Sequence, residues 1–99
     1  MDIEFIREKI RRKEYVIDPD HLLVLRKRGI SIRNIEYAIL TGEIIETYPS
    51  DLILGFIGNN TPLHVACSYW AEERMIYIHT AYIPDARWKS DFRTRRRKR

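Results

Sequence analysis

Residues 43–82, EIIETYPSDLILGFIGNNTPLHVACSYWAEERMIYIHTAY, change the hydrophobic pattern of the chain and decide its fold. β-branched and aromatic residues dominate, and the period of the pattern is two, as in half-buried strands. Short breaks at residues 49–51, 58–61 and 71–73 divide the stretch into four predicted strands. Because these connections are too short for helical crossovers, we expect the strands to pair in sequence as a four-stranded antiparallel meander.

The residues before this stretch show helical spacing and recognisable helix boundaries. Apolar residues recur every three to four positions behind Asp2, which predicts a first helix over about residues 2–13. A second helix is predicted to begin at Asp18 and a third at Ser31, and each is followed by a glycine. Helices first and strands afterwards predict an α+β fold, with the helices on one face of the sheet and the other face open.

Composition limits the class of protein. With 99 residues, we expect one domain with one modest core. Cys67 is the single cysteine, so neither an intramolecular disulfide nor a cysteine metal site can form. The chain has no apolar stretch of signal-peptide or membrane-span length, and we therefore expect a cytoplasmic protein without membrane association. It has no metal, phosphate-loop or serine-hydrolase motif, so we predict no metal and no cofactor.

Positive charge is concentrated towards the two ends of the chain. Residues 87–99 contain eight Lys or Arg and one Asp, and residues 7–33 contain nine Lys or Arg, whereas residues 34–73 contain none. We expect a single domain over residues 1–99 with a basic tail over about residues 93–99. This polarity suits RNA or an acidic protein, although a solvated surface and a frayed terminus would also account for it.

His64 is the leading candidate for a functional residue, because it lies in an otherwise apolar strand, where an imidazole needs a hydrogen-bond partner or solvent. If residues 71–73 form the hairpin loop, His64 lies opposite Thr80 and shares the open face with Tyr82. A lone histidine in a strand is more often structural than catalytic. RNA cleavage without metal, however, needs a base, an acid and cationic groups at the phosphate, which His, Tyr and Arg can supply.

The two other histidines are weaker candidates. His79 alternates with Tyr77, so it joins His64 only in a different strand register. His21 follows Asp20 at the start of the second predicted helix, where a local carboxylate contact or simple exposure explains it.

The residues after the last predicted strand contain two aromatic residues, Trp88 and Phe92, four positions apart. This spacing predicts an apolar stripe that pins the segment to the body of the domain. The contact would also fix the positions of four basic residues: Arg87, Lys89, Arg93 and Arg95.

Blocks spread over nearly the whole chain carry a family resemblance: MDIEFIREKI, ILTGEIIETYP, PLHVAC and TAYIPDARWKSDFRTRRRKR. They resemble a small family of bacterial and archaeal domains of unknown function that is grouped with BrnT-like and RelE-like toxins. The resemblance implies the fold of the barnase, EndoU, colicin and RelE superfamily, whose members place helices before a meander and include ribonuclease toxins.

The resulting hypothesis is a metal-independent endoribonuclease of a toxin and antitoxin pair, acting on free or ribosome-associated RNA. His64 would act as base or acid, Tyr82 as hydrogen-bond donor or second acid, and Arg93 and Arg95 as phosphate clamps. The expected nucleic-acid-binding residues are Arg26, Arg28, Thr80, Arg87, Trp88 and Lys89. The alternative is a non-catalytic module of the same fold that binds nucleic acid or an acidic antitoxin protein. Either can form a homo-oligomer.

Overall fold

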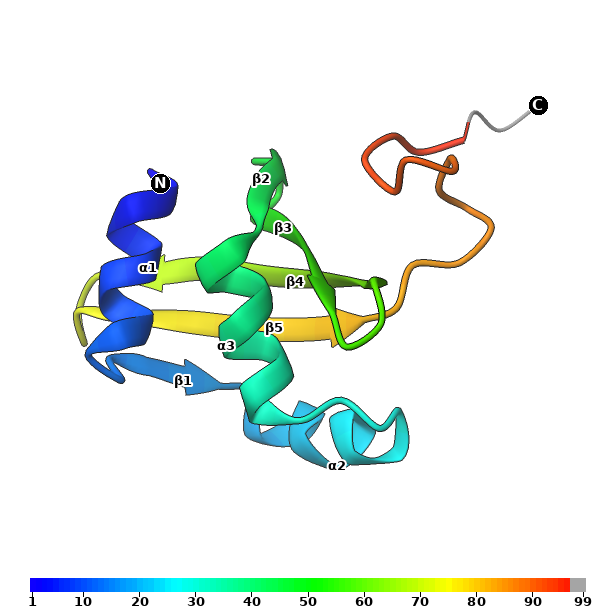
Figure 1. Ribbon diagram of the computed structural model, residues 1–99. Helices are drawn as coiled ribbons and strands as arrows, with labels where there is room; N and C mark the ends of the chain where they lie inside the picture. Colours follow the sequence, from blue (N-terminus) through cyan, green and yellow to red (C-terminus); the bar gives the residue numbers. More distant parts are fainter. Residues whose placement is uncertain (97–99) are drawn as a thin grey trace.

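A computed structural model describes residues 1–96 and confirms the α+β class, with three helices and a five-stranded mixed sheet (Figure 1). In chain order the elements are α1 (Ile3–Arg11), β1 (Tyr15–Ile17), α2 (Pro19–Lys27), α3 (Ile32–Thr41), β2 (Glu43–Glu46), β3 (Asp51–Ile57), β4 (Thr61–Trp70) and β5 (Met75–Tyr82).

The three predicted helices are confirmed, each with its predicted cap. Asp2, Asp18 and Ser31 each accept a backbone N–H of the first turn, which satisfies a donor that the helix itself leaves unpaired. Gly29, with a φ of 73°, lies in the left-handed region and turns the chain from α2 towards α3. Gly42 is needed for a different reason. A Cβ added there would lie 2.3 Å from a carbonyl oxygen of β3.

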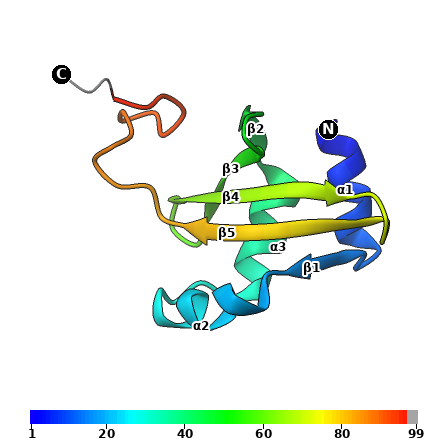
Figure 2. The same ribbon diagram turned by 180° about the vertical axis from the view of Figure 1, so that it is seen from behind.

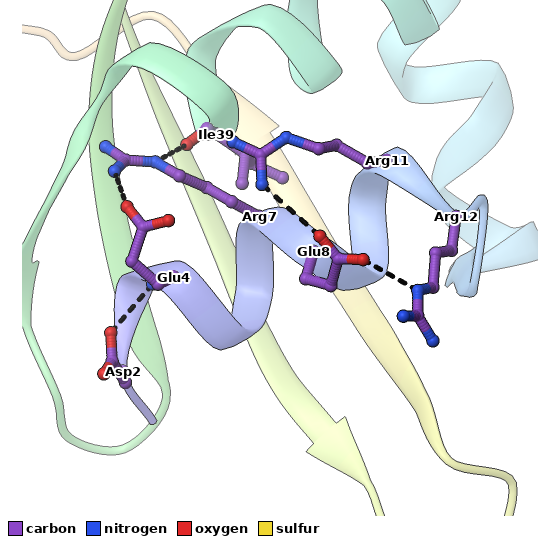
Figure 3. Close-up of polar contacts among 7 residues, drawn as sticks. All are labelled: Asp2, Glu4, Arg7, Glu8, Arg11, Arg12 and Ile39. Carbon is purple, nitrogen blue, oxygen red and sulfur yellow. Dashed lines mark hydrogen bonds and ion pairs between the residues drawn. The ribbon is translucent and has the colours of Figure 1, made fainter.

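Arg7 fastens α1 to α3. Its side chain donates to the Gly42 carbonyl at 2.7 Å and to the Ile39 carbonyl at 3.4 Å, at the C-terminal end of α3, where a helix leaves acceptors unpaired. Figure 3 shows the contact with Ile39. On the same helix Glu8 pairs with both Arg11 and Arg12 (Figure 3). Lys9 donates to the Arg74 carbonyl at 2.7 Å, so the basic side chains of α1, and Arg12 beside it, are engaged with other groups of the protein.

The strand order of the sheet is β1-β5-β4-β3-β2. The four predicted strands form the predicted antiparallel meander. The prediction of a four-stranded sheet is wrong, because β1 adds a fifth strand, parallel to β5, with Val16 beside Tyr77. Three residues are too few to show an alternating pattern, so only pairing with a distant part of the chain makes this segment a strand.

The helices α1 and α3 lie side by side on one face of the sheet, and none of the helices in residues 1–96 covers the opposite face (Figures 1 and 2). The helix α2 lies beyond β1 (Figure 1). Burying an aliphatic side chain contributes about 1.5–3 kcal/mol, so the layer between helices and sheet supplies most of the stabilisation. Its fully buried large aliphatic residues are Ile6, Ile10, Ile35, Ile39, Ile53, Leu63, Val65, Ile76 and Ile78.

The hairpin of β4 and β5 differs in register from the prediction. Trp70 pairs with Met75, whereas the prediction paired it with Arg74. The loop is thus one residue longer, and Arg74 takes a positive φ of 55° within it. A shift of one residue exchanges the two faces of a strand. Ile76 and Ile78 consequently lie in the core, whereas the predicted loop over residues 71–73 would have put them on the open face together with His64.

A β-bulge in β5 changes the register a second time, because His79 is an extra residue without a partner of its own in β4. His64 therefore lies opposite Tyr82 and not opposite the predicted Thr80. Directly opposite residues share a face, so the bulge brings the His64 and Tyr82 side chains together on the helix-free face. The predicted pairing with Thr80 is wrong, but the prediction that His64 and Tyr82 share a face is correct.

Candidate functional site

The C-terminal segment, residues 84–96, covers one end of the helix-free face. It leaves the end of β5 and turns back towards β2 (Figure 1, orange to red). Trp88 is only 4 % exposed, and its ring packs edge-on against that of His64 with 4.4 Å between centroids. Leu52 and Leu54 of β3 are also buried, and they lie on the same side of the sheet as His64. These residues form a second, smaller core.

The segment is folded by its own turns, not as the helical stripe that the spacing of Trp88 and Phe92 predicts. The Lys89 N–H donates to the Thr94 carbonyl at 2.7 Å. The Asp91 carboxylate accepts the Arg93 N–H at 2.9 Å, a bond that lowers the pKa of Asp91. Trp88 nevertheless does pin the segment to the body, as predicted.

His64 is fully buried beneath this segment. Its Nε2 lies 2.7 Å from the Phe92 carbonyl oxygen and its Nδ1 lies 3.3 Å from the Tyr82 hydroxyl oxygen. A carbonyl can only accept, so Nε2 carries the proton and Nδ1 accepts the Tyr82 proton. Burial lowers the pKa of His64, which favours this neutral form. The predicted water-accessible position of His64 is therefore wrong, because Trp88 covers the ring.

Tyr82, unlike His64, is accessible from the surface. It is half-buried and lines a groove of about 380 Å³ between α2 and the C-terminal segment. Burial raises the pKa of its phenol, so the hydroxyl is neutral at pH 7 and can donate to His64. We call this cavity the Tyr82 groove, and its lining residues are Arg28, Ile30, Tyr82, Ile83, Asp85 and Arg87.

Arg93 and Arg95 fasten the segment to β2. Arg93 pairs with Glu43, and Arg95 forms a two-nitrogen contact with Glu46 at 2.9 and 3.0 Å. The Arg95 guanidinium also lies 4.5 Å from the centroid of the Trp88 ring. Both predicted phosphate clamps thus already have carboxylate partners. Of the predicted basic tail, residues 97–99 lie outside the described part of the chain.

Arg28 and Arg87, predicted to bind nucleic acid, lie on the Tyr82 groove. Arg28 donates through Nη1 to the Ala81 carbonyl at 2.8 Å, which ties it to the end of β5. Arg87 pairs with Asp85 at 3.0 Å, and this contact lowers the pKa of Asp85. Two predicted cations therefore converge on the groove that contains Tyr82.

His21 is a functional candidate that sequence reasoning underestimated. Its Nε2 lies 2.8 Å from the Thr80 hydroxyl and 3.4 Å from Nη1 of Arg28. Because a guanidinium can only donate, Nε2 acts as an acceptor and helps to orient Arg28. No sequence pattern around His21 indicates this contact, because it joins α2 to β5 and its two residues, His21 and Thr80, lie 59 positions apart. Thr80 thus supports the groove indirectly, through His21.

The remaining predicted residues lie elsewhere. Arg26 lines a different cleft, beside α2. Lys89 is exposed on the C-terminal segment and is not among the groove-lining residues. His79 reaches the helix-free face through the bulge and lies 2.7 Å from the Ser68 hydroxyl.

Residues 1–96 contain neither a membrane-spanning helix nor a cluster of metal-binding side chains. No helix in this range is both long enough and apolar enough to cross a bilayer. No group of three or more His, Cys, Asp or Glu side chains in this range is arranged to hold a metal ion.

The sequence matches one protein family model, described as a domain of unknown function (DUF4258), over residues 22–83. The match runs from the middle of α2 to just beyond the end of β5, so α1, β1 and the C-terminal segment lie outside it. No curated protein and no solved structure matches the chain. The resemblance to a family of unknown function is confirmed at that level, whereas the link to BrnT-like and RelE-like toxins, and to their fold, stays a prediction.

Proposed function

Because the chain belongs to the DUF4258 family, whose description assigns no function, we propose a function from its own residues: it binds RNA in the Tyr82 groove. The observation that supports this proposal is the placement of Arg28 and Arg87 in one groove with an aromatic ring. Guanidinium groups bind phosphate through charge-assisted hydrogen bonds, and aromatic rings stack on nucleobases. Single-stranded RNA presents both groups.

The charges of the groove favour an anionic ligand. Asp85 cancels one of the two arginine charges, but the side chain of Arg87 is 83 % exposed. An ion pair this exposed contributes about 0–1 kcal/mol, so a phosphate can compete with Asp85 for Arg87. Arg28 is held by Ala81 through one nitrogen, and a guanidinium has five N–H donors. Donors therefore remain for a ligand.

The binding test compares Arg28→Gln with Arg12→Gln, a control that removes the same charge from the residue after α1, far from the lining of the groove. A short single-stranded RNA is titrated by fluorescence anisotropy at several salt concentrations. Losing a charged hydrogen bond costs about 1.5–3 kcal/mol, so Arg28→Gln should weaken binding about tenfold or more. It should also reduce, by about one, the slope of the logarithm of the binding constant against the logarithm of the salt concentration. Equal losses in both variants would reject the groove as the binding site.

A second candidate function, endoribonuclease activity, is favoured by the hydrogen-bond chain from Tyr82 through His64 to Phe92. In this proposal the Tyr82 oxygen takes the proton of the ribose 2′-OH while its own proton passes to Nδ1 of His64. The 2′ oxygen attacks phosphorus, and the bond to the 5′ oxygen breaks. The Tyr82 oxygen gives its proton to the departing 5′ oxygen and takes the proton back from Nδ1 of His64. His64 thus acts through Tyr82, because the ring itself is buried.

Tyr82→Phe separates cleavage from binding, since it keeps the ring and removes the hydroxyl. With a chelator present, the wild type should yield a 2′,3′-cyclic phosphate and a 5′-hydroxyl product, and Tyr82→Phe should bind RNA without cleaving it. Wild-type binding without product would eliminate this second candidate and leave the RNA-binding function standing.

A further inference from the structure

A second cavity lies beside the Tyr82 groove, between α2 and the beginning of α3. We call it the α2–α3 cleft. It encloses about 590 Å³ and shares only Ile30 with the Tyr82 groove. Its lining is almost entirely apolar and consists of Leu22, Leu23, Leu25, Arg26, Gly29, Ile30, Ser31 and Ile32.

This cleft exposes large aliphatic side chains. Leu22 is 45 % exposed, Leu23 60 % and Ile32 51 %, while the only buried residue of α2 is Leu25. Burying a leucine or isoleucine contributes about 1.5–3 kcal/mol. A partner that covered these three side chains would therefore gain binding free energy from their burial. Contiguous apolar patches on a protein surface commonly mark interaction sites.

The segment that lines the cleft carries charge of one sign. Residues 22–33, which include the whole lining, contain four Lys or Arg and no Asp or Glu. Arg26 lines the cleft itself, and Lys27 and Arg33 adjoin it in the sequence. A second copy of this chain that met the first through the same cleft would bring like charges together. The charge therefore favours an acidic partner.

We propose that the α2–α3 cleft binds an acidic amphipathic helix of a partner protein. A concave apolar cleft accepts a ridge of side chains, and a helix presents such a ridge at positions i, i+3, i+4 and i+7. Glu or Asp beside the ridge would meet Arg26, Lys27 and Arg33. This inference is independent of the proposed RNA-binding function.

The test uses two synthetic helical peptides with leucines at this spacing, one flanked by glutamates and the other with lysine at every glutamate position. Fluorescence anisotropy gives the affinities, and amide chemical shifts identify the site. The acidic peptide should bind with a micromolar Kd and shift residues 22–33, while the basic peptide should bind at least about tenfold more weakly.

Two substitutions in the cleft sharpen the test. Leu23→Asp should abolish binding, whereas Tyr48→Asp, a control at an exposed aromatic residue outside the cleft, should not. Arg26→Glu should reduce the preference for the acidic peptide about tenfold, and as a surface substitution it leaves the fold intact.

The proposal is overturned if neither peptide binds, if both bind equally, or if the shifts fall outside residues 22–33. A wild-type dimer that Leu23→Asp converts to a monomer would also overturn it, in favour of self-association.

Discussion

At the scale of the residue, His64 joins three parts of the chain: β4, β5 and the C-terminal segment. Its two ring nitrogens bond to the Tyr82 hydroxyl and the Phe92 carbonyl. A buried polar group that loses its partner costs about 1–3 kcal/mol, so the imidazole and its two partners depend on one another. His64 therefore positions Tyr82 and holds the segment, whether or not the protein cleaves RNA.

We predict that His64→Phe lowers the free energy of unfolding by about 1–3 kcal/mol, because it leaves the Phe92 carbonyl without its donor. Urea denaturation followed by tryptophan fluorescence measures this change. His79→Phe serves as control, since His79 is only partly buried and bonds to the Ser68 side chain. A stability loss no larger than that of the control would contradict the structural role assigned to His64.

The stability of the protein should also depend on pH through His64. Its pKa is lowered in the folded state, so the unfolded state binds more protons as the pH falls below the ordinary value of about 6.5. Stability is then complete above that pH and declines below it. Measured between pH 7 and pH 5, the wild type should lose more stability than His64→Phe. Parallel curves for the two proteins would show that the ring titrates as if exposed.

At the scale of the element, the C-terminal segment is held by one buried indole and by ion pairs to β2. The Arg95–Glu46 pair is exposed, so it contributes only about 0–1 kcal/mol. The buried ring of Trp88 must supply more of the attachment than the ion pairs do. The ion pairs fix where the segment lies along the edge strand.

We predict that Glu46→Gln loosens the segment without unfolding the domain. The amides of Lys89 and Arg96, which bond within the segment, should exchange with solvent faster, while the midpoint of thermal unfolding changes little. Glu8→Gln weakens two exposed pairs, with Arg11 and Arg12, and should leave these two amides unaffected. Unchanged exchange in Glu46→Gln would mean that Trp88 alone positions the segment.

At the scale of the whole molecule, two cores lie on opposite faces of one sheet. The larger fills the space between sheet and helices, and the smaller lies under Trp88. Because β4 contributes to both through alternate residues, Val65 on one face and His64 on the other, the two cores should unfold together.

Trp88→Ala tests this coupling. Truncating a buried tryptophan costs about 3–5 kcal/mol, a large part of the stability of a small domain. Trp70→Ala is the matched control, since Trp70 is 41 % exposed and should cost much less. Denaturation followed by far-UV circular dichroism should give one transition, shifted strongly by Trp88→Ala only. If that variant kept its stability, the C-terminal segment would be an independent flap.

The sequence alone determined the features that depend on near neighbours. Asp2, Asp18 and Ser31 cap their helices because a cap acts within one turn, and the alternation of residues 43–82 specifies the meander because it needs no distant partner. Aromatic spacing likewise indicated that Trp88 contacts the body.

Only the tertiary structure decided which side chains meet across the sheet. The strand β1 exists through its distant partner β5, and the bulge at His79 sets His64 opposite Tyr82. The burial of His64 and the pairing of Arg95 with Glu46 likewise depend on where the C-terminal segment folds back. These contacts join residues far apart in the chain, and a one-residue change in a loop or strand redirects every side chain beyond it.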